Sequence, residues 1–257
     1  ILISLIKKRS IILKSIKENL ILVFFTSIIC FYMKSGYDGS LYHLPHQNFI
    51  KDYKIIFGLF NLHERFGATS IYGYISSIFW IKNDLILLSF LQGIFYFLFF
   101  KILKNLLQSK FLLNQLLPIS TIIFTPIWIR YIEPSYSLVD FPTGIIFYFA
   151  FYKGIELIIL KKNIYENYKE FLIISSLLFT LKSSGAIFII YLLFVSFYLL
   201  KNNYLKIKNI ILSLSLPILL VLFWLMKTFV NTGCLIFPFP ITCFDTTNID
   251  QYLSSWH

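Results

Sequence analysis

Side chains that could do chemistry gather in one polar stretch, residues 36–69. It holds Asp38, His43, His46 and Arg65, with tyrosines and phenylalanines between them. A few polar groups among aromatic rings are typical of a site for a small polar ligand such as a sugar. A positioned carboxylate can take the proton of an attacking hydroxyl, so Asp38 is predicted to be a general base or, alternatively, an ordinary hydrated interfacial residue. The two histidines and the arginine are predicted to bind substrate.

Three further charged residues lie near predicted ends of hydrophobic segments: Arg130, Asp140 and Lys182. A cation beside a leaving phosphate stabilises the negative charge that develops there, so the two basic residues are predicted to bind phosphate. Asp140 is a second catalytic candidate, which could orient Lys182 or the sugar. The structural alternatives are extension of the two cations to lipid head groups and capping of a helix by the aspartate.

A divalent metal site is a weaker hypothesis for the same polar stretch. His43 and His46 are three residues apart, a spacing that can place both on one helix face. Pro45 lies between them, however, and no third His or Cys follows at the spacing of a zinc site. The sequence also has no phosphate-binding glycine loop, dinucleotide-binding turn or nucleophile elbow. We therefore expect no cofactor, with a divalent metal as the alternative.

The elements that must position these residues are membrane helices. Of the 257 residues, 58% are hydrophobic and 14% are charged, whereas soluble domains carry about a quarter charged residues. Apolar runs recur from Ile11 to Met226. The net charge of +11 comes mainly from lysine clusters between these runs, which leaves no basic face for nucleic acid. The composition therefore predicts an all-α, polytopic transmembrane bundle embedded in the lipid bilayer.

We expect about seven hydrophobic helices in a single transmembrane domain, residues 1–257. Polar residues around Lys182 interrupt the segment 171–200, which predicts a hairpin of two short helices. The segment 70–84 is too short to span the bilayer and is predicted to lie at its surface. Because the chain starts at Ile1, we expect it to be a fragment of a longer protein. The other predicted spans are 19–35, 85–103, 111–129, 141–160 and 208–226.

Positive charge predicts how these helices cross the membrane. Fifteen of the 23 Lys and Arg residues fall in the N-terminal segment or in loops expected on the same side, and cytoplasmic loops are the ones that retain such residues. The N-terminus and the loop 161–170 are therefore predicted to be cytoplasmic. Loops 36–69 and 227–257 are predicted to lie outside the plasma (inner) membrane.

The three cysteines occupy two kinds of position. Cys30 lies inside a hydrophobic run, where packing is its expected role. Cys234 and Cys243 share one predicted outer loop and could form a disulfide. Two free thiols are the favoured interpretation, because sequence alone does not fix the distance between them.

Four short motifs follow one another along the chain. They are YDGSLYH with Asp38, extended by the segment GLFNLHERFGATS; SYSLVDFP with Asp140; LKSSGA with Lys182; and VNTGCLIFPFP after an outward helix. Their order resembles the N-terminal half of multi-spanning glycosyltransferases of the C-type superfamily (GT-C), especially bacterial enzymes related to lipopolysaccharide-core and dolichyl-phosphate-mannose-dependent transferases. The segment GLFNLHERFGATS also looks like a subfamily of uncharacterised bacterial membrane proteins.

The resemblance implies interfacial helices in the first outer loop and transfer of a sugar from a polyprenyl-phosphate donor. The acceptor would be a glycan or lipid of the cell envelope, on the outer face of the membrane. Two positions depart from the family pattern: Gly39 stands where many relatives have a second acid, and 234–237 stands where a small polar residue with proline is commoner. The alternative is a non-enzymatic polytopic protein, such as a polysaccharide exporter or a transporter subunit, which is expected to place charged or broken helices at mid-membrane.

Overall fold

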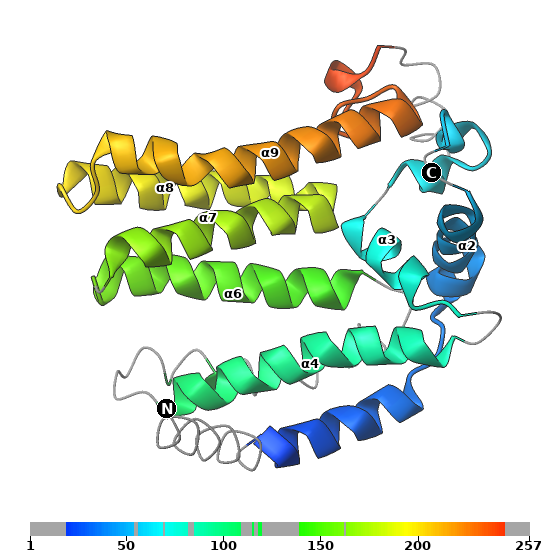
Figure 1. Ribbon diagram of the computed structural model, residues 1–257, viewed down its shortest axis with the longest axis horizontal. Coiled ribbons are helices and arrows are strands. Elements are labelled where there is room, and N and C mark those ends of the chain that lie inside the picture. Colours follow the sequence, from blue (N-terminus) through cyan, green and yellow to red (C-terminus); the bar gives the residue numbers. More distant parts are fainter. Residues whose placement is uncertain are drawn as a thin grey trace, which may run out of the picture. The chain divides into compact units, whose positions relative to one another are not determined.

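Helices make up every regular element in the part of the chain that the computed structural model describes (Figure 1). This confirms the all-α fold that the composition predicts. The chain divides into two compact units, one made of Ile1–Gly39 and Phe79–Leu138, the other of Ser40–Ile78 and Val139–His257. The single domain expected from the sequence stays a prediction. The described residues are 19–53, 56–68, 70–81, 85–108, 115, 118–119, 139–161 and 163–244.

Four described helices are long and apolar enough to cross a membrane. They identify the chain as an integral membrane protein with several spans, as the composition predicts. The predicted span 111–129 lies almost wholly outside the described residues. The four helices are α4 (Ile86–Leu107), α6 (Asp140–Ile159), the segment Ser183–Lys201, which includes α8 (Phe188–Lys201), and α9 (Ile207–Thr232).

The first unit pairs α4 with a shorter apolar helix, Asn19–Tyr32. Where the two meet, a Cβ atom on Gly93 would come within 2.3 Å of the Cys30 Sγ. Small residues at such contacts let helix backbones approach closely within a membrane, which explains a glycine in the middle of α4. Cys30 is buried there with a free thiol, so its predicted packing role is confirmed.

The second unit contains a bundle of four helices, α6 to α9. Within it, α7 (Ile164–Leu181) packs against both α6 and α9. Figure 1 shows the four helices side by side, with consecutive helices running in opposite directions because short turns join them. The Tyr168 hydroxyl adds a hydrogen bond of 2.8 Å to Ser196 of α8. The buried core consists of Ala150, Leu157, Tyr168, Phe171, Leu172, Leu178, Phe188, Val195, Leu199, Leu205 and Ile210.

The segment 171–200 is a hairpin, as its polar interruption predicts. α7 ends at Leu181, a short 3-10 helix, η4 (Ser183–Ile187), turns the chain, and α8 follows. A Cβ atom on Gly185 would lie 2.7 Å from the Leu178 carbonyl oxygen. This close contact with backbone requires glycine, which accounts for the glycine of the LKSSGA motif.

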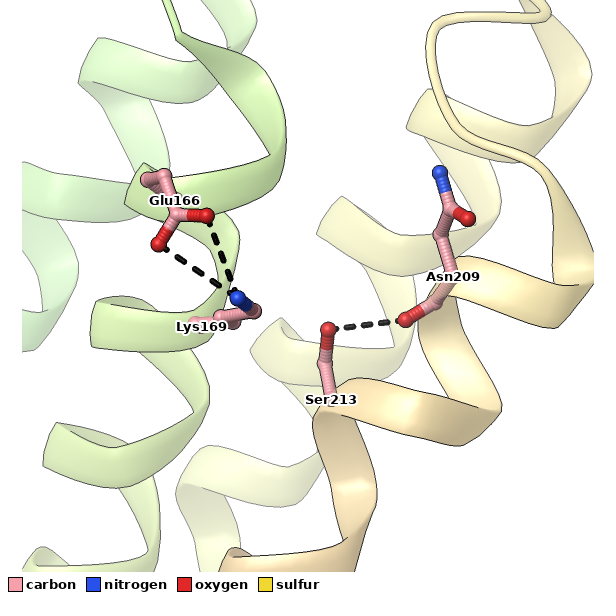
Figure 2. Close-up of polar contacts among 4 residues, drawn as sticks. All are labelled: Glu166, Lys169, Asn209 and Ser213. Carbon is pink, nitrogen blue, oxygen red and sulfur yellow. Dashed lines mark hydrogen bonds and ion pairs between the residues drawn. The ribbon is translucent and has the colours of Figure 1, made fainter.

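The charged stretch 161–170 is mostly helical, whereas the sequence analysis expected a loop. α7 begins at Ile164, so only a tight turn joins it to α6. Figure 2 shows one reason: Glu166 in the first turn pairs with Lys169 at 3.1 Å, a spacing that stabilises a helix. A carboxylate near a helix N-terminus is also favourable for the helix dipole. Figure 2 also shows the first turns of α9, where the Ser213 hydroxyl donates a hydrogen bond to the Asn209 backbone carbonyl.

Short helices cover the end of this bundle at which α7 and α9 finish (Figure 1). Two of them pack on α9, and α3 contacts α7. α3 has only eight residues, which agrees with the prediction that the segment 70–84 is too short to span the bilayer. The predicted outer loop 36–69 therefore contains helices of its own. These elements are α2 (Leu44–Asp52), η2 (Leu59–Asn61), η3 (Glu64–Gly67), α3 (Ile71–Ile78) and η5 (Pro240–Thr242).

Candidate functional site

Asp140 and Lys182, two of the residues predicted from the sequence, meet in an ion pair between Oδ1 and Nζ. They are 42 residues apart in the chain, and each side chain is 45% exposed. An exposed ion pair contributes little to folding stability, so its main effect is to fix the position of the two groups. The arrangement matches the expectation that Asp140 orients Lys182.

Helix ends place this pair. Asp140 is the first residue of α6, where a carboxylate is favoured by the positive end of the helix dipole. Lys182 directly follows α7 and has an extended backbone, with φ −151° and ψ 134°. The change from helical to extended backbone at this residue turns its side chain out of the helix. The break in the hairpin therefore exposes the ammonium at the same end of the bundle as Asp140.

A small pocket lies at this end of the second unit. Its volume of about 20 Å³ has room for one water molecule. Three sequence motifs contribute to it, from η3, from η4 and from the loop after α9. Ser183 of the LKSSGA motif is one of the lining residues and directly follows Lys182. The complete lining is Gly67, Ala68, Phe179, Ser183, Trp224, Thr228, Leu235, Ile236 and Phe237.

Close packing at Gly67 joins two of these motifs. A Cβ atom on Gly67 would come within 2.8 Å of the Phe60 ring and 2.9 Å of the Phe237 ring. The two rings pack edge to face, with centroids 5.2 Å apart. Gly67, the second glycine of GLFNLHERFGATS, is therefore needed so that η3 can approach the loop after α9.

A disulfide between Cys234 and Cys243 closes the loop after α9. The sequence analysis favoured two free thiols, and the structure shows that the alternative it left open, a disulfide, is present. Sequence could not show the pairing because the loop folds back through hydrogen bonds and packing contacts that local spacing does not determine. Thr242 supplies two of these: its carbonyl accepts from the Leu235 amide at 3.0 Å, and its hydroxyl donates to the Ile236 carbonyl at 3.0 Å.

Lys227 is a functional candidate that the sequence analysis counted only among the outer basic residues. Its ammonium lies over two aromatic rings, 4.5 Å from the centroid of Tyr74 and 4.4 Å from that of Trp224. The Nζ atom is buried and has no hydrogen-bond partner among the described residues. A lysine in the apolar run WLMKTFVN was the available signal, because an ionisable residue inside a membrane helix is a functional candidate by default.

His46, predicted to bind substrate, is buried in α2 at 6% exposure. Its ring stacks on Phe66 at a centroid distance of 5.3 Å, and its Nε2 has no hydrogen-bond partner among the described residues. Burial, together with the positive charges of Lys227 and His43, lowers the pKa of His46 to about 3. The imidazole is therefore neutral at physiological pH and could bind a ligand through a hydrogen bond but not through charge.

The other predicted site residues are dispersed among several environments. The Arg65 guanidinium lies over the Tyr42 ring at 4.9 Å, and His43 packs beside the same ring at 4.3 Å. Asp38 belongs to the first unit, so its convergence with Asp140 and Lys182 stays a prediction.

Two of the earlier expectations concern a cation and a metal. Arg130 lies outside the described residues, so its predicted phosphate contact stays a prediction. Within the described ranges, no group of three or more His, Cys, Asp or Glu side chains could hold a metal ion.

The fold and this site define a polytopic α-helical membrane protein with a small pocket at one end of a helix bundle. Residues 1–250 match the family described as "Domain of unknown function (DUF8201)", and the chain belongs to that family. No curated protein and no solved structure matches the chain.

Proposed function

We propose that the protein is a membrane glycosyltransferase that moves a sugar from a polyprenyl-phosphate donor to a glycan or lipid acceptor of the cell envelope. The observation that carries this proposal is the meeting of three distant motifs at one pocket, next to the Asp140–Lys182 ion pair. These motifs contribute Gly67, Ser183 and Phe237. They are the segments that resemble GT-C enzymes, and a site shared by them supports a common task.

The chemistry requires one base and one cation. The acceptor hydroxyl oxygen would bond to the anomeric carbon of the sugar, and the bond from that carbon to the lipid phosphate would break. The phosphate would leave with the electron pair, and a carboxylate would take the hydroxyl proton. Asp38 is our candidate for the base. Lys182, oriented by Asp140, is our candidate for stabilising the leaving phosphate.

Two features support an outward-facing site in the plasma membrane. The loop beside the pocket contains the Cys234–Cys243 disulfide, and disulfides persist outside the reducing cytosol. The opposite end of the bundle carries a group of lysines, which favours the cytoplasmic side. These are Lys161, Lys169, Lys201, Lys206 and Lys208.

Transfer of a labelled sugar by the purified protein in liposomes tests the proposal. Asp38→Asn should reduce transfer by roughly 100-fold or more, because the amide keeps the size of the side chain but cannot accept the proton. The matched control is Asp52→Asn, the same change at an exposed position of α2, which should leave the rate unchanged. Full transfer by the Asp38→Asn protein would end the assignment of the base.

One observation favours a second candidate, a non-enzymatic exporter or transporter subunit. Lys227 lies inside a helix apolar enough to span the membrane, and ionisable residues there often mark transport pathways. It is five residues from the end of α9 at Thr232, nearer the membrane surface than the middle, which favours surface chemistry. Movement of a glycan across liposomes, with no sugar transferred from any polyprenyl-phosphate donor, would favour transport instead.

A further inference from the structure

The aromatic clamp around Lys227 encloses a cation near the membrane surface. Tyr74 from α3 and Trp224 from α9 form this clamp and meet edge to face, with centroids 6.3 Å apart. Aromatic faces attract an ammonium but do not accept its hydrogen bonds, so its three N–H donors are not satisfied by them. A buried charge of this kind is costly unless a partner binds to it.

A second polar group, the side-chain amide of Asn231, is buried on the same face of α9, at 1% exposure. It lies beside the Tyr74 phenol, and neither Nδ2 nor Oδ1 makes a well-formed hydrogen bond with a described residue. It lies one turn beyond Lys227, which puts the two side chains next to each other. Burial raises the pKa of the Tyr74 phenol, and the Asn231 side chain beside it has the opposite effect, so the amide lies close to the same clamp.

The position along α9 indicates which anion fits. Lys227 is five residues before the helix end, which is about 7.5 Å at 1.5 Å per residue. The polar head-group layer on each side of a bilayer is about 5–8 Å thick, so this ammonium lies near the depth of lipid phosphates. A phosphate carries several acceptor oxygens, and lysine is one of its common ligands. The ammonium and the amide together offer several donors to such a group.

Trp224 connects this cation with the pocket. The indole packs on the Lys227 ammonium and also lines the pocket together with Thr228. We propose that Lys227 and Asn231 form a binding site for the phosphate group of a membrane lipid, which Trp224 covers on the pocket side.

In the proposed reaction this phosphate is that of the polyprenyl donor, so Lys227 would bind the same phosphate that Lys182 stabilises as it leaves; to that extent the inference rests on the proposed function. Binding itself needs no sugar and no transfer. The full chain in a non-ionic detergent would be titrated with a polyprenyl phosphate, with the same polyprenol lacking phosphate, and with inorganic phosphate. Thermal unfolding would report binding, since a ligand that binds only the folded state raises Tm.

We expect the polyprenyl phosphate to raise the Tm of the wild-type protein by several degrees and the polyprenol to have no comparable effect. Lys227→Met should abolish that rise and should leave Tm without ligand equal to or above the wild-type value, because an unpaired buried charge is removed. If Lys227→Met has a lower Tm without ligand and polyprenyl phosphate still raises its Tm by the wild-type amount, the proposed site is overturned. An equal rise from inorganic phosphate would overturn the assignment to a lipid.

Two further variants keep the test decisive. Asn231→Leu should weaken the rise without a change of charge, and an unchanged rise in this variant would remove Asn231 from the site. Lys201→Met, the same change at an exposed residue at the other end of the bundle, should keep the full rise.

Sugar transfer separates this inference from the proposed function. If the protein binds the polyprenyl phosphate but transfers no sugar, the phosphate site is supported and the glycosyltransferase proposal is overturned. If Lys227→Met transfers sugar with an unchanged KM for the donor, the phosphate site is overturned and the glycosyltransferase proposal is supported.

Discussion

The two ends of the helix bundle in the second unit differ in how their buried polar groups are satisfied. Towards the turn between α6 and α7, acidic and basic side chains pair with one another: Lys153 contacts Glu156 at 3.3 Å and Glu170 at 3.0 Å. The other end also has an ion pair, the exposed Asp140–Lys182 pair, but there the buried ammonium of Lys227 has no hydrogen-bond partner among the described residues.

The difference separates a stabilising region from a binding region. At the first end, the charge pair between Lys153 and Glu170 joins neighbouring helices and holds them in register. Unpaired buried polar groups lower stability, and proteins retain them where a ligand or a reaction needs them. Gly67, Ser183 and Phe237, which come from three distant motifs, line the pocket at the second end. We expect substitutions at the two ends to differ accordingly.

The largest expected effect on stability comes from removal of the disulfide. Cys234 and Cys243 are nine residues apart, and closing a loop of this length is worth about 2–3 kcal/mol in the chain-entropy model. Replacement of both by serine should lower the free energy of unfolding by about that amount. Chemical unfolding in detergent would measure it. Reduction of the wild-type protein should lower the free energy of unfolding by the same amount and should not affect the double variant. If the reductant destabilises the double variant equally, the disulfide is not the source of this stability.

The second effect concerns acid sensitivity at the binding end. His46 has a folded-state pKa of about 3, below the usual 6.5, so only the unfolded chain takes up the proton between these values. Stability is therefore present above pH 6.5 and is lost as pH falls towards 3. Between pH 7 and pH 5 the loss should be about 2 kcal/mol for this group.

His46→Phe tests this, because a phenyl ring can keep the stacking on Phe66 but cannot titrate. Unfolding of both proteins would be followed at pH 7, 6 and 5. The variant should lose about 2 kcal/mol less than the wild type over this range. Parallel pH profiles for the two proteins would show that His46 is not the buried neutral group.

Sequence reasoning predicted elements better than it predicted burial. Apolar length alone located α4, α6 and α9, and the polar interruption at Lys182 located the hairpin, because membrane spans need a nearly continuous apolar surface. The stretch 161–170 was expected to be a loop, since its charge was weighed and the helix-stabilising spacing of Glu166 and Lys169 was not.

The candidate site was predictable only in part. Asp140 and Lys182 were linked because both fall at ends of predicted segments on the same side. Lys227 was missed, since its importance depends on the rings of Tyr74 and Trp224, which are distant from each other in sequence. The disulfide was likewise undecided, because local spacing does not determine whether a loop folds back on itself. Both are properties of tertiary packing.

A third, smaller effect is expected at the stabilising end. Lys153 is 15% exposed and joins α6 to Glu170 of α7. Lys153→Met should lower the free energy of unfolding by about 1 kcal/mol, near the upper value for a partly exposed pair, because two carboxylates then lose their shared partner. A double-mutant cycle with Glu170→Gln would measure the coupling. A coupling near zero would show that this end is not stabilised by its charges.

The smallest effect is expected for the exposed pair within α7. Glu166→Gln removes the charge that contacts Lys169 and the carboxylate in the first turn of the helix (Figure 2). Because both groups face solvent, we expect a fall in Tm of only about 1 °C at low ionic strength. Salt should remove the difference, since about 1 M salt shortens the screening length to about 3 Å. Thermal unfolding at low and high salt would test this, with Lys201→Met as a control for loss of a single exposed charge. If the fall in Tm persists at high salt, the charge contact is not its cause, and packing of the side chain against the turn must stabilise the start of α7 instead.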